Sequence, residues 1–401
     1  MTPQVLVVGG GMITNDQILP SLYHMQRQGV VGSIAVCAQH ARTVQKLKDS
    51  AVFAAAFPGQ SFHAYPESGD SPQPDLYKEV IAKMARHNIV IAAVPDQLHF
   101  DVVMTALQHD QHVCCVKPLV LTVRESLLIE TEARKRGLVV GVEYHKRLDD
   151  RSLMARQKYR QGLFGEFRLG TAKLMEKWYY RSSNFQNWCT TENSDAFSYI
   201  GCHYVDLVHF ITGLLPASVS VYGIKDKYPN GNEGYLWSDA RVIWQNGACL
   251  NVQNSLSFPD AAPGTNTQGI VMYCSGNDAG GLIEHSDQYR GLQYSYVRPR
   301  PEFAEPSPDY FQYVNLGGAG LQPVGYGLRS IEFAVQKCIA AESAADPQAY
   351  LATLDAEGVL ATPANSRYNE LVMEAGRLSI LNDAREVLID YGPTPGVRLR
   401  A

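Results

Sequence analysis

The run Val5–Val8 (VLVV) leads directly into the turn Gly9-Gly10-Gly11-Met12-Ile13-Thr14, and a helix-compatible stretch with Leu19, Leu22 and Met25 follows. The order is therefore strand, glycine turn and helix. Glycines in such a turn permit tight backbone dihedrals and let the main chain approach a phosphate, while the helix N-terminus supplies N–H groups and the positive end of its dipole. The segment predicts a dinucleotide-binding turn at the head of a parallel α/β sheet.

The main-chain groups of Gly9, Gly11, Met12 and Ile13 are the expected contacts to the pyrophosphate of the dinucleotide. The third glycine of a G-x-G-x-x-G fingerprint is absent, and Thr14 stands in its place. A small residue there still allows the helix to pack closely on the strand. A tight surface turn without a ligand is the alternative interpretation, and the position between a strand and a helix favours dinucleotide binding.

Residues 1–145 alternate short apolar runs with helix-period segments, which is typical of a doubly wound parallel sheet with helices on both faces. The runs lack polar alternation because strands buried on both faces need apolar side chains on each face. We expect strands at Gln4–Val8, Ser33–Ala38, Ile89–Val94, His112–Val116 and Leu138–Glu143. Residues 1–145 are thus predicted to form a Rossmann dinucleotide-binding domain.

The pattern changes after residue 145, and residues 146–401 are interpreted as an α+β domain with an open, mainly antiparallel sheet. Its expected strands are Phe167–Met175, Ala217–Tyr222, Ala240–Trp244, Cys249–Asn254 and Gly269–Cys274. Its expected helices are Arg151–Arg160, Ala196–Thr212, Gly327–Ala341 and Ala364–Leu381, and the expected loops are Ser255–Thr267 and Pro299–Pro308. A late helix is expected to pack back on the first domain.

Composition narrows the range of functions. Hydrophobic residues make up 45% and charged residues 19% of 401 residues, which is ordinary for a folded chain. The net charge of -5 gives no basis for binding nucleic acid or an anionic membrane, and no apolar stretch reaches the roughly 20 residues of a transmembrane helix. The histidines and cysteines show no metal-binding spacing, so no metal is expected. A start without a secretory signal, together with thiols in apolar runs, predicts a cytoplasmic protein.

The end of the second expected strand carries no acidic side chain for the ribose hydroxyls, because Ala38 and Gln39 stand there. Gln39 is the expected ribose contact. Arg42 is a candidate for a 2'-phosphate, with a solvated helix-face charge as the alternative. The cofactor is therefore left as NAD or NADP.

Three later segments extend the pattern: Ala93-Val94-Pro95-Asp96-Gln97-Leu98-His99, His112-Val113-Cys114-Cys115-Val116-Lys117-Pro118-Leu119 and Gly201-Cys202-His203-Tyr204-Val205-Asp206. With the glycine turn they resemble, in order and spacing, the glucose-fructose oxidoreductase, inositol dehydrogenase and MocA family. That family has a T-P-N-x-x-H-like turn, then G-K-H-V-x-x-E-K-P-L, and later G-x-H-x-x-D. The resemblance covers the first half of the chain well and the second half loosely.

The resemblance implies an NAD(P)-dependent dehydrogenase or reductase that acts on a CH–OH group of a sugar, glycoside or inositol. It implies a second domain that binds this substrate and whose open sheet forms a homodimer or homotetramer. By the resemblance, Lys117 contacts the substrate hydroxyl and the nicotinamide, and His203 is the acid/base residue. Pro95 and His99 would lie alongside the cofactor.

Two positions depart from the family pattern. Val116 stands where the family has an acidic residue before the lysine, and Tyr199 stands where it has an aspartate four residues before the histidine. Tyr199 and His203, spaced i and i+4, share one face of a helix, so Tyr199 is a further candidate for catalysis and substrate binding. An aromatic–histidine pair packed in a core is the alternative.

These residue types suit hydride-transfer chemistry. Oxidation of an alcohol requires a base within about 2.6–3.2 Å of the hydroxyl, and a histidine such as His203 accepts and returns protons near neutrality. Lys117 follows a strand of the parallel sheet, at the carboxyl end where ligands of such sheets bind, and its charge can polarise the substrate oxygen. A solvated lysine at a strand end is the alternative.

Polar residues also follow the last strand of the first domain. Glu143, His145 and Arg147 are candidate substrate contacts, with interdomain salt bridges as the alternative. Trp178, in the run Trp178-Tyr179-Tyr180-Arg181, is a candidate stacking surface for a sugar ring, although aromatic clusters more often belong to cores or interfaces.

Two other functions remain open at this point. One is a redox-neutral glycoside-cleaving enzyme that uses bound NAD for transient oxidation at C3, and the other is a dinucleotide sensor without catalysis. The presence of both Lys117 and His203 argues against the sensor. Net formation of NAD(P)H distinguishes a dehydrogenase from the redox-neutral enzyme.

Overall fold

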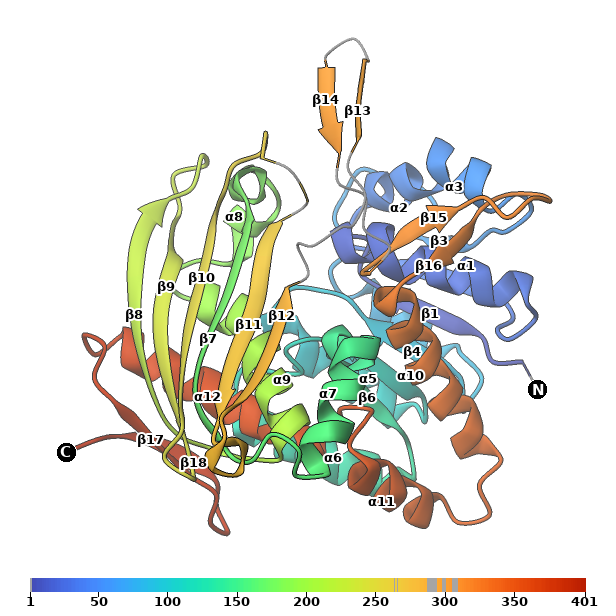
Figure 1. The fold of residues 1–401 in the computed structure, drawn as a ribbon. Helices are drawn as coiled ribbons and strands as arrows, with labels where there is room; N and C mark the ends of the chain where they lie inside the picture. Colours follow the sequence, from blue (N-terminus) through green and yellow to red (C-terminus); the bar gives the residue numbers. More distant parts are fainter. Residues whose placement is uncertain (1, 263, 265, 287–293, 298–300, 305–308) are drawn as a thin grey trace. The chain divides into compact units, whose positions relative to one another are not determined.

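The structure is a computed structural model that describes residues 2–262, 264, 266–286, 294–297, 301–304 and 309–401. The chain forms two compact units (Figure 1). Unit 1 comprises Met1–Val120, Arg124–Leu148 and Asp309–Ser366, and unit 2 comprises Leu121–Val123, Asp149–Pro308 and Arg367–Ala401. The predicted boundary at residue 145 lies close to the end of a unit 1 segment, and residues 309–366 return to unit 1 late in the chain.

Unit 1 is built on a parallel sheet of six strands in the order β3-β2-β1-β4-β5-β6. The strands are β1 (Val5–Val8), β2 (Ile34–Cys37), β3 (His63–Tyr65), β4 (Ile89–Ala92), β5 (His112–Val116) and β6 (Val140–Glu143). All residues of β1, β4 and β6 are buried, as the apolar runs predict. The predicted doubly wound fold is confirmed. The edge strand β3 was not predicted, because its three residues are too few to show a period.

Helices cover both faces of this sheet. The helical elements of unit 1 are η1 (Thr14–Ile18), α1 (Leu19–Arg27), α2 (Ala41–Lys48), α3 (Ala51–Ala56), α4 (Leu76–Ala82), η2 (Asp96–Leu98), α5 (His99–Gln108), α6 (Val123–Arg136), η3 (His145–Leu148), α10 (Tyr326–Glu342) and α11 (Pro347–Glu357). A two-stranded sheet is formed by β15 (Gln312–Val314) and β16 (Gln322–Val324). Late in sequence, α10 buries Ile331, Val335 and Cys338 in the same core as the strands (Figure 1).

Unit 2 contains a sheet of eight strands in the order β12-β11-β7-β10-β9-β8-β17-β18. The strands are β7 (Phe167–Lys177), β8 (Pro216–Lys227), β9 (Glu233–Trp244), β10 (Cys249–Phe258), β11 (Asn266–Cys274), β12 (Gly281–Ser286), β17 (Val387–Asp390) and β18 (Gly396–Leu399). Among the described pairs of this sheet, β7 and β10 run parallel and the others antiparallel. The predicted mainly antiparallel sheet is confirmed.

The helical elements of unit 2 are α7 (Asp150–Arg160), η4 (Trp178–Ser182), α8 (Phe185–Trp188), η5 (Phe197–Gly201), α9 (Cys202–Thr212), η6 (Gly276–Asp278) and α12 (Pro363–Ile380). The predicted helix from 196 to 212 begins with the π-helical turn η5, and it ends at Gly213, whose φ of 78° is the left-handed cap that glycine favours. Both α9 and α12 bury apolar side chains against one face of the sheet (Figure 1).

Two predicted loops need correction. The segment predicted as a loop over 255–267 contains the end of β10, which runs to Phe258, and the start of β11 at Asn266. The segment predicted as a loop over 299–308 contains β14 (Pro301–Ala304), paired with β13 (Tyr294–Val297), and its remaining residues lie outside the described ranges. In the described part of the chain, no helix is both long and apolar enough to cross a bilayer.

Candidate active site

The three glycines of the turn after β1 differ in how much room each leaves for a side chain. Gly9 has a φ of 116°, and a Cβ there would lie 2.0 Å from the carbonyl oxygen of Ala93, so only glycine fits. A Cβ on Gly10 would lie 2.8 Å from a methyl group of Thr43. Gly11 is exposed, and no atom lies within 4 Å of the Cβ position. The main chain at Gly11 is therefore open to a pyrophosphate, as the motif predicts.

Thr14 stabilises the glycine turn through a hydrogen bond from its side chain. Its hydroxyl donates a hydrogen bond to the carbonyl oxygen of Gly9 at 2.8 Å, and the side chain is fully buried. The helix begins at Thr14 as the π-helical turn η1. Met12 is exposed and Ile13 half-buried beside it. The residue in place of the third glycine thus fixes the turn, and the residues present fit a dinucleotide at this helix N-terminus.

The segment after β2 is exposed, as a ribose-binding segment would be. The side chains of Gln39 and Arg42 are both exposed, and the Gln39 carbonyl oxygen accepts a hydrogen bond from the main chain of Gln73 at 2.8 Å. Residues 38–42 contain no carboxylate. Gln39 and Arg42 remain predicted contacts to the adenosine end of the cofactor.

His99 joins two turns at the carboxyl edge of the sheet. One ring nitrogen lies 2.7 Å from the carbonyl oxygen of Pro118, the other lies 2.8 Å from that of Val94, and the residue is fully buried. These contacts connect the turn that contains half-buried Pro95 to the turn that contains Lys117. A role in positioning both turns therefore fits His99 better than the predicted contact with the cofactor.

Lys117 and Glu143 belong to neighbouring strand ends. Val116 pairs with Glu143 in the parallel ladder between β5 and β6. Lys117 comes immediately after Val116, is half-buried and is joined to Pro118 by a cis peptide bond. The sheet topology therefore brings Lys117 and the segment after Glu143 to the same edge, the one at which the glycine turn also lies.

Glu143 is buried in a network of hydrogen bonds. Its Oε1 accepts from Gln17 Nε2 at 2.7 Å and from the Ser330 hydroxyl at 2.6 Å, and its Oε2 lies 3.2 Å from Nδ1 of His145. Burial alone would raise the pKa of Glu143, but the charge and hydrogen bond of His145 and the bonds from Ser330 and Gln17 lower it instead. The carboxylate is therefore ionised and occupied by its protein partners.

His145 lies between two aromatic rings. Its ring stacks on Tyr326, with centroids 5.6 Å apart, and meets Tyr310 at 5.2 Å with a tilt. The Tyr310 hydroxyl donates to Gln17 Oε1 at 2.5 Å, so the rings belong to the same network as Glu143. Gln17, Tyr310, Tyr326 and Ser330 were not predicted from the sequence, because no local motif marks them.

Arg147 is a structural residue in this arrangement. It is 2% exposed, its guanidinium lies 5.7 Å from the centre of the Tyr144 ring, and it donates to the Gly358 carbonyl oxygen at 3.4 Å. Burial within unit 1 favours this role over the predicted substrate contact. Of the three polar residues predicted at the end of β6 and just beyond it, only His145 is not fully buried.

In unit 2, the helix η5–α9 carries Tyr199 and His203. Tyr199 packs edge-on against Phe185 and Trp188, with ring centroids 4.5 and 5.5 Å away. His203 is 6% exposed in the first turn of α9. Asp206 accepts a hydrogen bond from the Tyr368 hydroxyl at 2.7 Å, which ties α9 to α12 within unit 2. Tyr199 thus belongs to an aromatic cluster, and His203 remains the predicted acid/base residue.

Trp178 opens the helical turn η4 and is 46% exposed. The Arg181 guanidinium lies 4.2 Å from the centre of its ring. Because the indole is only half covered, Trp178 remains a predicted stacking surface for a sugar ring.

Among the described residues, His87, His112 and Glu342 are close enough to hold a metal ion, with ligand atoms within 4.8 Å of one another. The main-chain N–H of Val139 donates to Nδ1 of His112 at 3.0 Å, so Nδ1 carries no proton. Nε2, 2.6 Å from Glu342, then carries the proton of the neutral ring. A metal on Nε2 would remove that proton as well. We therefore interpret the cluster as a hydrogen-bonded contact between α10 and β5.

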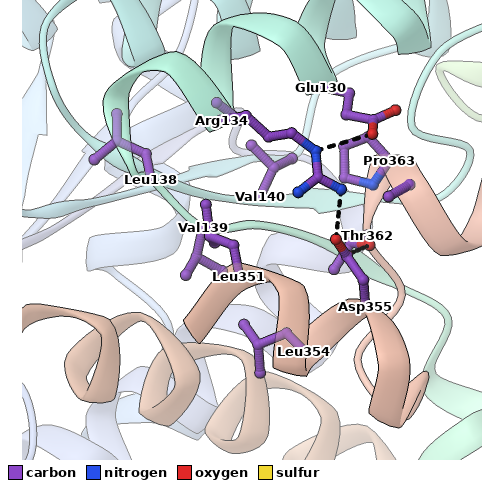
Figure 2. A pocket seen from close by; sticks show the side chains of 12 residues that line it. Glu130, Arg134, Leu138, Val139, Val140, Leu351, Leu354, Asp355, Thr362 and Pro363 are labelled. Atoms are coloured by element: carbon purple, nitrogen blue, oxygen red, sulfur yellow. Dashed lines mark hydrogen bonds and ion pairs between the residues drawn. The ribbon is translucent and has the colours of Figure 1, made fainter. Parts of the chain in front are cut away.

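A pocket between α6, β6 and α11 is the subject of Figure 2. Apolar side chains such as Leu138 and Leu351 line it, and Arg134 closes one side by donating to Glu130 at 3.0 Å and to Asp355 at 2.7 Å. The residues that line this pocket include none of the predicted site residues. The ion pairs of Arg134 favour a structural contact between α6 and α11.

Residues 4–144 match the model of the oxidoreductase family with an NAD-binding Rossmann fold, GFO_IDH_MocA. This match confirms the family resemblance read from the motifs. It also agrees with the fold of unit 1, whose glycine turn offers an open main chain at a helix N-terminus.

Curated relatives match parts of the chain. D-glucoside 3-dehydrogenase of Escherichia coli (strain K12) is 23% identical over 223 residues, 54% of this chain and 56% of the relative. Levoglucosan dehydrogenase of Pseudarthrobacter phenanthrenivorans is 22% identical over 129 residues, 31% of this chain and 33% of the relative. The uncharacterized oxidoreductase YfiI of Bacillus subtilis is 32% identical over 97 residues, 23% and 25% of the two chains. The matched region spans from a quarter to just over half of these relatives.

Solved structures are similar over almost the whole chain. GenD2 from gentamicin A biosynthesis, in complex with NAD, has a TM-score of 0.69 at 15% identity and covers 97% of both chains. Myo-inositol 2-dehydrogenase from Lactobacillus plantarum has a TM-score of 0.64 at 14% identity, over 97% of this chain and 100% of the other. At these identities the likeness concerns the fold. The match over residues 4–144 and this likeness of fold make the chain similar to the GFO_IDH_MocA oxidoreductase family, whose NAD-binding Rossmann model covers part of unit 1.

Proposed function

We propose that the chain is an NAD(P)-dependent oxidoreductase that transfers a hydride between the nicotinamide and a secondary alcohol or ketone of a sugar, glycoside or inositol. The observation that carries the proposal is the position of Lys117, held beside the carboxyl edge of the parallel sheet by the contact between His99 and Pro118. The named relatives that match the chain include dehydrogenases of a D-glucoside and of levoglucosan.

The chemistry assigned to this chain follows from charge and proton transfer. A nicotinamide cofactor held at the glycine turn would supply the acceptor of the hydride in oxidation and its donor in reduction. In the oxidative direction, the carbinol C–H bond breaks with its electron pair, the O–H proton goes to a base, and a C=O bond forms. Lys117 stabilises the negative charge that develops on the substrate oxygen, and His203 takes the proton. In the reductive direction, His203 returns the proton to the oxygen.

The test begins with mass spectrometry of any ligand released from the purified protein. A panel of sugars, methyl glycosides and inositols is then assayed with NAD and with NADP, by nicotinamide absorbance and by product analysis. Net formation of NAD(P)H with at least one polyol supports the proposal, and so does loss of turnover in Lys117→Ala and His203→Ala variants that still bind NADH. Release of an aglycone from a glycoside without net change in absorbance would replace the proposal by the redox-neutral reaction.

We also propose a homodimer or homotetramer formed through the open sheet of unit 2. Leu169, Tyr273 and Leu282 are each about half exposed and are cross-strand neighbours on β7, β11 and β12. Exposed apolar side chains in a row mark protein contacts. Light scattering after size exclusion should give a mass above 44.3 kDa, and Tyr273→Lys should lower it. A monomer for the unaltered chain would contradict this part of the proposal.

A further inference from the structure

An exposed indole lies against a buried cation in unit 2, in the turn η4 at the end of β7. Trp178 begins this turn and is 46% exposed, whereas Arg181, three residues later, is 7% exposed. The Arg181 guanidinium lies 4.2 Å from the centre of the Trp178 ring and 5.4 Å from that of Trp237 on β9. The guanidinium is therefore placed between an inner ring and an outer ring, and only the outer ring is exposed.

The position of Arg181 is fixed by acceptors at the end of β8. Its Nη2 donates to Oδ2 of Asp226 at 2.8 Å and to the carbonyl oxygen of Lys227 at 2.7 Å. The main-chain N–H of Lys227 and the hydrogen bond and charge of Arg181 hold the pKa of Asp226 below its usual value, so this partner stays ionised. A cation with two acceptors and two ring contacts keeps one orientation, and it orients the indole of Trp178 with it.

The chain on the other side of Trp178 is held as well. Lys177 Nζ donates to three main-chain carbonyl oxygens of residues 259–262, at distances from 2.6 to 3.1 Å. The main-chain N–H of Tyr179 donates to Oδ1 of Asp260 at 2.9 Å. Both cations that flank the indole are thus engaged by groups of the protein. The turn therefore presents an uncharged aromatic ring, which suits an uncharged, flat part of a ligand.

Ring contacts connect this turn to the helix of His203. The ring centre of Tyr180, in the same turn, lies 5.9 Å from that of Phe185, which lies 4.5 Å from that of Tyr199. Tyr199 precedes His203 by four residues along η5–α9. Trp178 thus belongs to a segment that packs towards this helix but is separate from it. Its indole is placed for a second ring of a ligand whose first ring reacts at His203.

We infer that the chain acts on glycosides and that Trp178 is the stacking surface for an aromatic aglycone, with Arg181 as the positioning residue that orients the indole. The inference rests on the proposed function, which supplies the sugar ring that is oxidised. It assigns to Trp178 the aglycone rather than the sugar ring predicted from the sequence. Flat rings stack favourably, and an indole that is oriented in advance loses little freedom when the ligand binds.

Stacking is tested without turnover, by NMR of the indole N–H groups in ¹⁵N-tryptophan-labelled protein saturated with NADH. The chain has four tryptophans, and the signal of Trp178 is assigned by its loss in Trp178→Phe. We expect phenyl β-D-glucoside to shift this signal and methyl β-D-glucoside to shift it much less, because only the phenyl ring stacks. In Arg181→Gln the signal should broaden or split before any ligand is added, since the guanidinium no longer fixes the indole.

Specificity is tested with the phenyl and methyl glycosides of each sugar that the enzyme oxidises. Stacking of one ring predicts a roughly fivefold higher kcat/KM for the phenyl glycoside, mainly through KM, because the oxidised ring is the same. Trp178→Ala should abolish this preference without changing kcat/KM for the methyl glycoside, and Trp178→Phe should keep most of it. Arg181→Gln should reduce the preference in the same selective way. Leu163→Ala, which removes an apolar side chain that is 61% exposed, is the control and should leave it unchanged.

The inference and the proposed function fail in different ways. If no compound is oxidised with either cofactor, the proposed function is wrong, while a shift of the Trp178 signal by phenyl β-D-glucoside would still support the stacking surface and no shift would overturn it. If glycosides are oxidised but Trp178→Ala keeps the wild-type preference for the phenyl glycoside, the inference is wrong. Oxidation of free sugars or inositols but of no glycoside would also overturn it. Should Arg181→Gln fail to fold, the two Trp178 variants keep the inference testable.

Discussion

Val116 pairs with Glu143 at the ends of the adjacent parallel strands β5 and β6. Because of this register, Lys117 and His145 leave the sheet at one edge, each one or two residues beyond the pair. His99 fixes the turn of Lys117, and Gln17 connects Glu143 to the helix that follows the glycine turn. Unit 1 therefore brings a charged lysine, an oriented histidine and an open glycine turn to the same edge of one sheet.

The first prediction concerns the charge of Lys117. Lys117→Met keeps most of the side-chain volume and removes the charge, so kcat should fall by about a hundredfold or more, as for other single groups that stabilise developing charge. The affinity for NADH, measured by fluorescence, should change by no more than a few-fold. Lys158→Met, at an exposed position of α7, is the matched control and should keep wild-type kcat. Wild-type kcat in Lys117→Met would refute the assignment.

The second prediction contrasts two glycines of the same turn. Gly9→Ala places a Cβ against the Ala93 carbonyl at a φ of 116°, so the free energy of unfolding should fall by roughly 3 kcal/mol or more. Gly11→Ala meets no atom within 4 Å, so the unfolding midpoint in urea should be unchanged. The added methyl group should nevertheless lower the affinity for NADH about tenfold or more, because it occupies the open side of the turn. Equal affinity in Gly11→Ala and wild type would show that the pyrophosphate binds elsewhere.

A third prediction tests whether His99 positions the two turns. His99→Leu removes the buried ring whose nitrogens lie 2.7 Å from the Pro118 carbonyl oxygen and 2.8 Å from that of Val94, which should cost about 2–4 kcal/mol in the free energy of unfolding. At temperatures where the variant is folded, kcat should fall because the turn of Lys117 is no longer held. His109→Leu, at the exposed end of α5, controls for the loss of an imidazole and should change neither quantity. A stable His99→Leu variant with wild-type kcat would contradict the positioning role.

Local patterns were sufficient to predict the parallel sheet and the glycine turn. Each of these depends on neighbouring residues: an apolar run and a glycine cluster. The orientation of β7 relative to β10 was not predictable in the same way, because the alternation of side chains is identical in parallel and antiparallel strands. The strands themselves were therefore predicted, whereas the parallel pairing of β7 with β10 was not.

The network around Glu143 could not be predicted, since its donors are distant in sequence. Gln17 lies 126 residues and Ser330 lies 187 residues from Glu143. Gln17 is buried in a π-helical turn. The inward-facing positions of such a turn do not follow the α-helical period on which the sequence-based prediction relied. The burial of Arg147 was missed for a related reason, because arginine is mostly exposed and only the folded chain shows its partners.

A fourth prediction concerns the pH dependence of stability through Asp149, the N-cap of α7. Burial would raise the pKa of Asp149, but the hydrogen bonds and charges of His285 and Arg151 lower it to about 2 from the 3.8 of an unpaired carboxyl. A depressed pKa in the folded state stabilises the protein above about pH 4, by about 2 kcal/mol, and this contribution disappears as the pH falls from about 4 through about 2.

Asp149→Asn should separate this charge from the cap that Asp149 also provides, because the amide oxygen can still accept from the main-chain N–H of Arg151. In urea unfolding at pH 5, the variant should be less stable than the wild type by about 2 kcal/mol, and at pH 3 the difference should be clearly smaller because part of the wild-type carboxylate stability is then lost. Lys225→Gln, at an exposed position of β8, controls for a general change in charge and should show no such narrowing. An equal difference at both pH values would mean that Asp149 stabilises the fold through geometry rather than charge.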